Sequence, residues 1–159
     1  MSTIVCGILL IITLAQAPSP SAKDNPPAKD DQPIKVMVLV ILGTDKNKDI
    51  NERLAGIAPE LQKKDKTLTG FELYRTINQP MKMGESKLLE LVGKEKMNVT
   101  VNEKTDDAGH VTITVKPPKL DDITYGCTCG MFVPILTNYY TPDNKRLIIA
   151  VMAKPCKKK

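Results

Sequence analysis

The sequence predicts a mainly β domain: a β-sandwich-like fold of about eight short strands with one short, interrupted helix. Three observations support this fold class. Several segments alternate apolar and polar residues with a period of two, two other segments are continuous apolar runs rich in β-branched residues, and turn residues recur at short, regular spacing. An α+β layer, in which the helix packs on one sheet, is the alternative architecture.

The predicted domain begins and ends with strands of the same unusual kind. Residues 35–42, KVMVLVIL, and residues 147–153, LIIAVMA, are nearly continuous apolar runs. As strands, both would present apolar side chains on each face. A strand that is apolar on both faces is typical of the middle of a sheet, where both faces are covered. We therefore expect these two segments to be central strands.

A polar loop over 43–49 follows the first strand and leads into a helical region. Apolar residues then recur at helical spacing, at Ile50, Leu54, Ile57 and Leu61. Gly56 and Pro59 interrupt this run, so we expect two short turns, the second with Pro59 in its first turn. Asp49 and Glu52 have the spacing of a capping box, which predicts Asp49 as the helix cap.

The remaining strands are predicted from alternation. They cover residues 71–76, 88–92, 97–101, 111–115, 120–125 and 131–137. Pro134 places the last of these at a sheet edge or a bulge, because proline cannot donate to the ladder. In the hairpin that turns at 105–109, burial of both apolar sets requires paired residue numbers that sum to 212 or 214. Val101 is then expected to face Val111 or Ile113.

The first 17 residues have the pattern of a signal peptide. Residues 2–17 carry no charge, and the apolar run over 4–15 would form a helix of only about 18 Å, too short for a bilayer core of about 30 Å. Ala15-Gln16-Ala17 has the small-x-small form of a cleavage site. Cleavage after Ala15 and an uncleaved anchor are the alternatives. We expect export to the periplasm or the extracellular space, with no transmembrane span after cleavage.

The segment over 18–33, PSPSAKDNPPAKDDQP, contains five prolines and almost no large apolar side chain, which predicts a disordered linker. The folded domain is then expected over 34–153, followed by a basic tail over 154–159. The formal net charge is +5, and the four lysines of the tail carry +4 of it. The body of the domain is therefore near neutral, and its charge does not indicate specific nucleic-acid binding.

Cys127-Thr-Cys129, between two glycines, is the most distinctive local motif. In an oxidising compartment a disulfide to Cys156 is the expected role. A turn centred on Pro142-Asp143 pairs residues whose numbers sum to 285, which places Cys129 opposite Cys156. A bulge near Pro134 would shift the partner to Cys127.

The alternative for this motif is a metal-binding function, with a soft-metal site of the Cu(I) type. Two thiolates on one side of the chain, together with further sulfur ligands, suit such an ion. The candidate ligands are Cys127, Cys129, Cys156 and the methionines Met131 and Met152.

No catalytic or cofactor-binding signature is present in the predicted domain. It has one serine, Ser86, and one histidine, His110, and it has no Gly-rich phosphate-binding loop. Aromatic residues make up 4% of the chain, with no Trp, which argues against a stacking platform for bases or sugars. We therefore expect a non-enzymatic domain that needs no cofactor.

Two further motifs have simpler structural explanations. Asp45-x-Asn47-x-Asp49 is similar to the start of a calcium loop, but Ile50 and Gly56 stand where that loop needs Gly and Glu. A polar strand-to-helix turn is the expected structure there. Asn98-Val-Thr100 is a glycosylation sequon by pattern only, with Asn98 expected on the polar face of a strand.

The order of segments also carries a resemblance. A short leader and Pro-rich linker precede VMVLVILGTDKNKDINERLAGIAPELQK, then FELYRTINQPMKMGESKLLELVGKEKMNVTVNE and a closing LIIAVMA. Over 36–153 this resembles small exported bacterial proteins of an uncharacterised family. The resemblance implies export and a β-rich fold and supplies no activity. The function we expect is a binding or structural domain that acts on an envelope or extracellular partner, either a protein or another envelope component.

Overall fold

The computed structural model describes residues 33–105, 110–127 and 130–154 of the 159-residue chain. All of its elements belong to one compact unit, Asp31–Lys159. The strands are β1 (Ile34–Thr44), β2 (Gly70–Met81), β3 (Ser86–Glu90), β4 (Lys96–Thr105), β5 (Val111–Lys116), β6 (Ile123–Gly126), β7 (Val133–Tyr140) and β8 (Arg146–Lys154). A 3-10 turn η1 (Glu52–Leu54) and one helix α1 (Ala58–Lys64) lie between β1 and β2.

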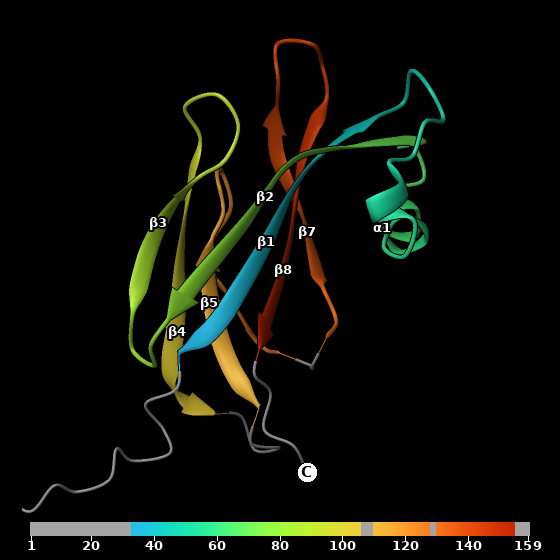
Figure 1. The fold of residues 1–159 in the computed structure, drawn as a ribbon. Coiled ribbons are helices and arrows are strands. Elements are labelled where there is room, and N and C mark those ends of the chain that lie inside the picture. The colour runs from blue at the N-terminus through green and yellow to red at the C-terminus, as the bar shows by residue number, and fades with distance from the viewer. Residues whose placement is uncertain (1–32, 106–109, 128–129, 155–159) are drawn as a thin grey trace, which may run out of the picture. The chain divides into compact units, whose positions relative to one another are not determined.

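The strands form two antiparallel four-stranded sheets (Figure 1). The first sheet has the order β2-β1-β8-β7, and the second has the order β3-β4-β5-β6. Side chains of both sheets form one core cluster between them, while α1 lies on the other side of the first sheet (Figure 1). The predicted mainly β, sandwich-like class is confirmed.

The two central strands of the first sheet are buried on both faces, as the sequence predicts. One face of β1 and β8, which includes Val38 and Ile149, belongs to the core between the sheets. The other face, which includes Ile41 and Ile148, packs in a second cluster with Leu61 of α1. Packing of the helix on one sheet is the feature that defined the alternative α+β architecture, and the structure also has this packing, between α1 and the first sheet.

The second sheet has one buried and one polar face. On its inner face Met97, Val99 and Ile113 are completely buried. Paired numbers of β4 and β5 sum to 214, with Val101 opposite Ile113, so the predicted register is confirmed. The ladder shifts beyond this pair, where Val111 faces Thr105.

The helical region consists of two short turns, as predicted, and proline occupies the first turn of α1. The predicted cap was wrong. Asn51, not Asp49, caps η1, and its side chain accepts a hydrogen bond from the backbone of Arg53. The reason is that Ile50 forms a parallel bridge with Phe71, which keeps the chain extended past Asp49 and delays the first turn.

The edge strand β2 is longer than the sequence predicts. β2 continues to Met81, beyond the predicted end at residue 76. A bulge between its pairs with Val40 and Ile41 breaks the period of two, so the polar second half does not show the alternation of a strand. Pro134 lies on the edge strand β7, as predicted.

The predicted ladder between β7 and β8 was wrong. Paired numbers sum to 286 beside the turn, at Tyr140 with Arg146, and to 284 beyond an irregularity, as at Val133 with Val151. Neither value is 285. The backbone N–H of Thr141 donates to the carbonyl of Lys145 at 2.9 Å, so the pairing beside the turn already sums to 286. The irregularity between Leu136 and Tyr140 then shifts the sum to 284.

Several sequence predictions lie outside the described residues. They are the signal peptide over 1–17, all of the linker over 18–33 except Pro33, the tail beyond Lys154, and Cys129 and Cys156. Within the described part of the chain, no helix has both the length and the apolar character needed to cross a bilayer.

Candidate functional site

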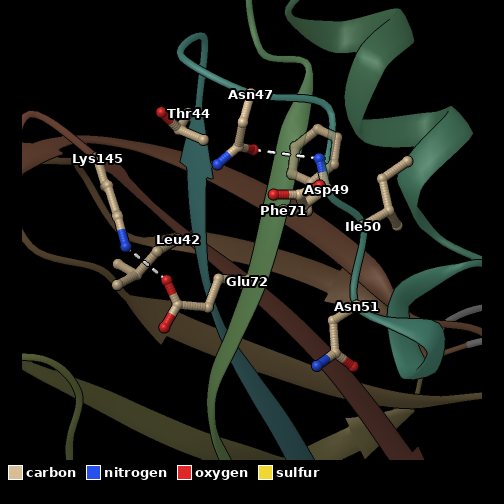
Figure 2. Close-up of a pocket in the computed structure, with 9 residues that line it drawn as sticks. All are labelled: Leu42, Thr44, Asn47, Asp49, Ile50, Asn51, Phe71, Glu72 and Lys145. Atoms are coloured by element: carbon tan, nitrogen blue, oxygen red, sulfur yellow. Dashed lines mark hydrogen bonds and ion pairs between the residues drawn. The ribbon is translucent and has the colours of Figure 1, made fainter.

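A pocket of about 320 Å³ lies at the end of the first sheet where β1 finishes and β2 begins (Figure 2). The chain between these strands starts with an exposed loop, residues 45–51, which forms one wall of the pocket. The other contributions come from β1, β2 and the hairpin between β7 and β8. The lining residues are Leu42, Thr44, Asn47, Asp49, Ile50, Asn51, Phe71, Glu72 and Lys145.

Short-range hydrogen bonds shape the 45–51 loop. Three side-chain oxygens accept from the backbone N–H two residues further on, a pattern that replaces regular structure in turns. The pairs are Thr44 with Lys46 at 3.2 Å, Asn47 with Asp49 at 3.2 Å, and Asn51 with Arg53 at 3.1 Å. Of the three residues that are similar to the start of a calcium loop, Asn47 takes part in this turn pattern through its side chain.

Backbone contacts with β2 hold the loop in place. The N–H of Phe71 donates to the carbonyl of Asp49 at 2.8 Å, and the N–H of Asn51 donates to the carbonyl of Phe71 at 3.0 Å. Gly70 allows this close approach. A Cβ there would collide with the side chain of Asn47 and lie 3.0 Å from Cγ2 of Thr44.

An ion pair forms the opposite wall. Lys145 Nζ donates to Glu72 Oε2 at 2.6 Å, and this hydrogen bond raises the pKa of Lys145 (Figure 2). The ammonium of Lys145 therefore stays charged at neutral pH, and the charge of Glu72 balances it. Asp49 is exposed, and its carboxylate makes no ion pair within the described part of the chain. The lining thus carries one unbalanced negative charge.

The rest of the pocket surface is apolar. Ile50 is 41% exposed, while Leu42 and Phe71 are buried and contribute the inner surface. A ligand would meet carboxylate, carboxamide and ammonium groups on two sides and aliphatic or aromatic carbon on the third. Such a combination of an apolar surface with a few convergent polar groups is typical of small-molecule sites.

A second groove of about 320 Å³ lies between the helical region and the chain before β7. Its apolar lining residues include Leu39, Ile57, Phe132 and Met131, of which Met131 is 58% exposed. Arg53 and Glu60 are the charged residues of its lining.

The structure describes only part of the predicted sulfur sites. Cys127 is 2% exposed and belongs to the core between the sheets, whereas Met131 is exposed and Met152 is buried within β8. Cys129 and Cys156 are not described, so the disulfide and the soft-metal site both remain predictions. Residues 33–105, 110–127 and 130–154 contain no group of three His, Cys, Asp or Glu side chains that could hold a metal ion.

The other predicted polar residues have identifiable positions. Ser86 lies on β3, where its Oγ is 2.6 Å from Oγ1 of Thr100, and His110 precedes β5. Asn98 lies on β4 between Leu88 and Lys116 of the neighbouring strands, on the polar face that the alternation predicts. Ser86 thus has a neighbouring hydroxyl as its partner on the sheet surface.

Sequence reasoning did not find the pocket. Glu72 and Lys145 are separated by 73 positions, and no local spacing links them. The alternating Asp45, Asn47 and Asp49 were the local signal in this region, and their pattern predicted a turn. No protein-family model, no curated protein and no solved structure matches this chain.

Proposed function

We propose that this chain is an exported, non-enzymatic binding domain that recognises an envelope or extracellular partner, either a protein or another envelope component. The observation that supports the proposal is the open pocket at one end of a tightly packed sandwich. Buried aliphatic side chains fill the space between the sheets, including Val38, Val99 and Ile149. Because the space between the sheets is filled, the sandwich serves as a rigid scaffold, and a partner would bind at a surface site such as this pocket.

The charge of the pocket supports a partner other than nucleic acid. Nucleic-acid binding depends on clusters of unpaired Lys and Arg that contact phosphates. Here Lys145 is paired with Glu72, and Asp49 adds a negative charge that would repel a phosphate. Specific recognition of DNA or RNA at this site is not part of the proposal.

Export is the second part of the proposal, together with membership of the exported bacterial family that the chain resembles. N-terminal sequencing of the mature protein tests it. We expect a start at Pro18, or at Gln16 if cleavage follows Ala15. Recovery of intact Met1 in a membrane fraction would indicate an anchor instead.

Binding is tested by crosslinking and capture from a native envelope preparation. Ile50→Lys replaces the exposed apolar side chain of the pocket wall with a positive charge beside Asp49. Leu88→Lys is the matched control, because Leu88 is also an exposed aliphatic residue, 62% exposed, but lies on β3 of the other sheet. We expect one captured component that Ile50→Lys loses, that Leu88→Lys keeps, and whose mass is unchanged after elution. Equal capture by both variants, or a chemically altered component, would contradict the proposal.

Native mass spectrometry after anaerobic purification separates this function from the soft-metal alternative. A binding domain should have the mass of the mature polypeptide alone. A stoichiometric metal adduct that a chelator removes would favour the site built on Cys127, Cys129 and Cys156.

A further inference from the structure

We infer that the pocket at the β1–β2 end binds a primary ammonium group attached to an aliphatic residue, as at the N-terminus of a peptide. The inference rests on the proposed binding function and names the chemistry that the site selects. It depends on three features of the pocket: its unbalanced charge, the apolar residue beside that charge, and the ion pair that engages Lys145.

The unbalanced charge is the carboxylate of Asp49. The backbone N–H and carbonyl of Asp49 are both engaged, with Asn47 Oδ1 at 3.2 Å and with Phe71 N at 2.8 Å. These backbone contacts hold the residue at the pocket wall while its carboxylate stays available (Figure 2). An ammonium group would form a charge-assisted hydrogen bond there, stronger than a bond between neutral groups.

The aliphatic part of the ligand has a surface beside this carboxylate. Ile50 follows Asp49 in the chain, lines the same pocket and is 41% exposed. Leu42 and Phe71 extend the apolar surface inward. The volume of about 320 Å³ is at the small end of the range of about 300–1,000 Å³ for ligand pockets, which suits one residue rather than a long segment.

The lysine of the pocket is not available for an anionic ligand. Lys145 is held by Glu72 at 2.6 Å, so a ligand carboxylate would have to compete with Glu72 while Asp49 repels it. A free amino acid should therefore bind more weakly than its amide, and an anion should bind least.

Four leucine derivatives test this charge preference at constant side-chain shape. L-leucinamide carries an ammonium, L-leucine is a zwitterion, N-acetyl-L-leucinamide is neutral and N-acetyl-L-leucine is an anion. Each is titrated into the ¹⁵N-labelled mature protein to about 10 mM, enough to detect a dissociation constant of about 1 mM. We expect affinity to fall in the order given, with amide shifts concentrated at Asn47, Asp49, Ile50 and Glu72.

Asp49→Asn and Asp45→Asn form a matched pair of variants. Both change an exposed aspartate of the same loop, but Asp45 does not line the pocket. Asp49→Asn should weaken L-leucinamide about three- to tenfold, the range expected for a partly exposed charge-assisted contact. Asp45→Asn should leave the affinity unchanged.

Three results would overturn the inference: no shifts with L-leucinamide, equal affinity for the acetylated neutral form, or equal affinity in Asp49→Asn. The Ile50→Lys capture experiment distinguishes this failure from failure of the proposed function. If Ile50→Lys still abolishes capture while L-leucinamide does not bind, the pocket recognises a different chemistry. If neither experiment shows binding, both proposals fail.

Discussion

The two sheets of the sandwich differ in what covers their outer faces. The first sheet is packed against the second on one side and against η1 and α1 on the other, so β1 and β8 are buried on both faces. The second sheet has no such cover in the described structure, and its outer face carries a row of hydroxyl residues, Ser86, Thr100, Thr114 and Thr124, each opposite the next.

This difference explains where the pocket forms. The chain must leave β1, cross to the outer face of the first sheet and return as β2, and the 45–51 loop makes that crossing. Hydrogen bonds to β2 hold the loop against the sheet end. The first sheet therefore ends in a pocket with polar lining residues. The described outer face of the second sheet instead carries the row of hydroxyl residues.

The largest expected effects come from adjacent substitutions in the two sheets. The side chains of Ile148 and Ile149 point to opposite faces of β8. Ile148→Ala and Ile149→Ala should each lower the free energy of unfolding by about 2–5 kcal/mol. In the second sheet Ile113→Ala should cost the same, but its neighbour Thr114→Ala less than about 1 kcal/mol. Urea unfolding measures all four. A small effect of Ile148→Ala would contradict the claim that the helical region covers a true second core.

The predicted disulfide, from Cys129 or alternatively Cys127 to Cys156, would tie the chain after β8 to the segment between β6 and β7. A loop of about 28 residues closed by this bond should add roughly 3–4 kcal/mol in the chain-entropy model. Non-reducing peptide mapping identifies the bond, and the single variants Cys127→Ser and Cys129→Ser decide which cysteine takes part. Three free thiols in the mature oxidised protein would show that the prediction is wrong.

Gly70 and Gly56 differ in the space around them: a Cβ at Gly70 would meet close neighbours, whereas a Cβ at Gly56 would not. Gly70→Ala should destabilise the fold by about 1–3 kcal/mol and weaken pocket binding, because its Cβ would displace the loop at Asn47. A Cβ at Gly56 meets nothing within 4 Å, so Gly56→Ala should be neutral or slightly stabilising. Thermal unfolding measures both variants. A neutral Gly70→Ala would mean that the loop is not held against β2.

The smallest effects concern ion pairs. Asp65, at the end of α1, accepts hydrogen bonds from Thr67 and pairs with Arg146 of β8 at 2.6 Å, with 17% of its side chain exposed. These contacts, first the hydroxyl of Thr67, lower the pKa of Asp65. Asp65→Asn should cost about 1–2 kcal/mol at neutral pH. The exposed Lys116–Asp122 pair of the second sheet is the control, and Asp122→Asn should have no measurable effect.

The pH dependence of the Asp65 contribution follows from the direction of its shift. Because the folded pKa lies below the unfolded one, the stabilisation is complete above the ordinary value of 3.8 and is lost as the pH falls through the folded value. The difference in urea midpoint between wild type and Asp65→Asn should therefore shrink in acid. A difference independent of pH would show that the ionised carboxylate is not responsible.

Local patterns were sufficient to predict most of the fold. The continuous apolar runs of β1 and β8 indicated burial on both faces. The alternation of β4 and β5 predicted both strands and limited the partner of Val101 to Val111 or Ile113, of which the structure has Ile113. Irregularities were not predictable: the bulge in β2 and the shift between Leu136 and Tyr140 depend on how neighbouring strands accommodate twist and turns. The pocket depends on the pairing of Glu72 with Lys145, which only the folded chain brings together.

The most direct test of the binding account maps the partner onto the two sheets. A solubilised envelope fraction that contains the captured component is added to the ¹⁵N-labelled mature protein, and amide shifts are recorded. The account predicts changes at the pocket, around Asn47, Asp49, Glu72 and Lys145, and none along the outer face of the second sheet. Shifts centred on Thr100 and Thr114, with the pocket unchanged, would contradict it.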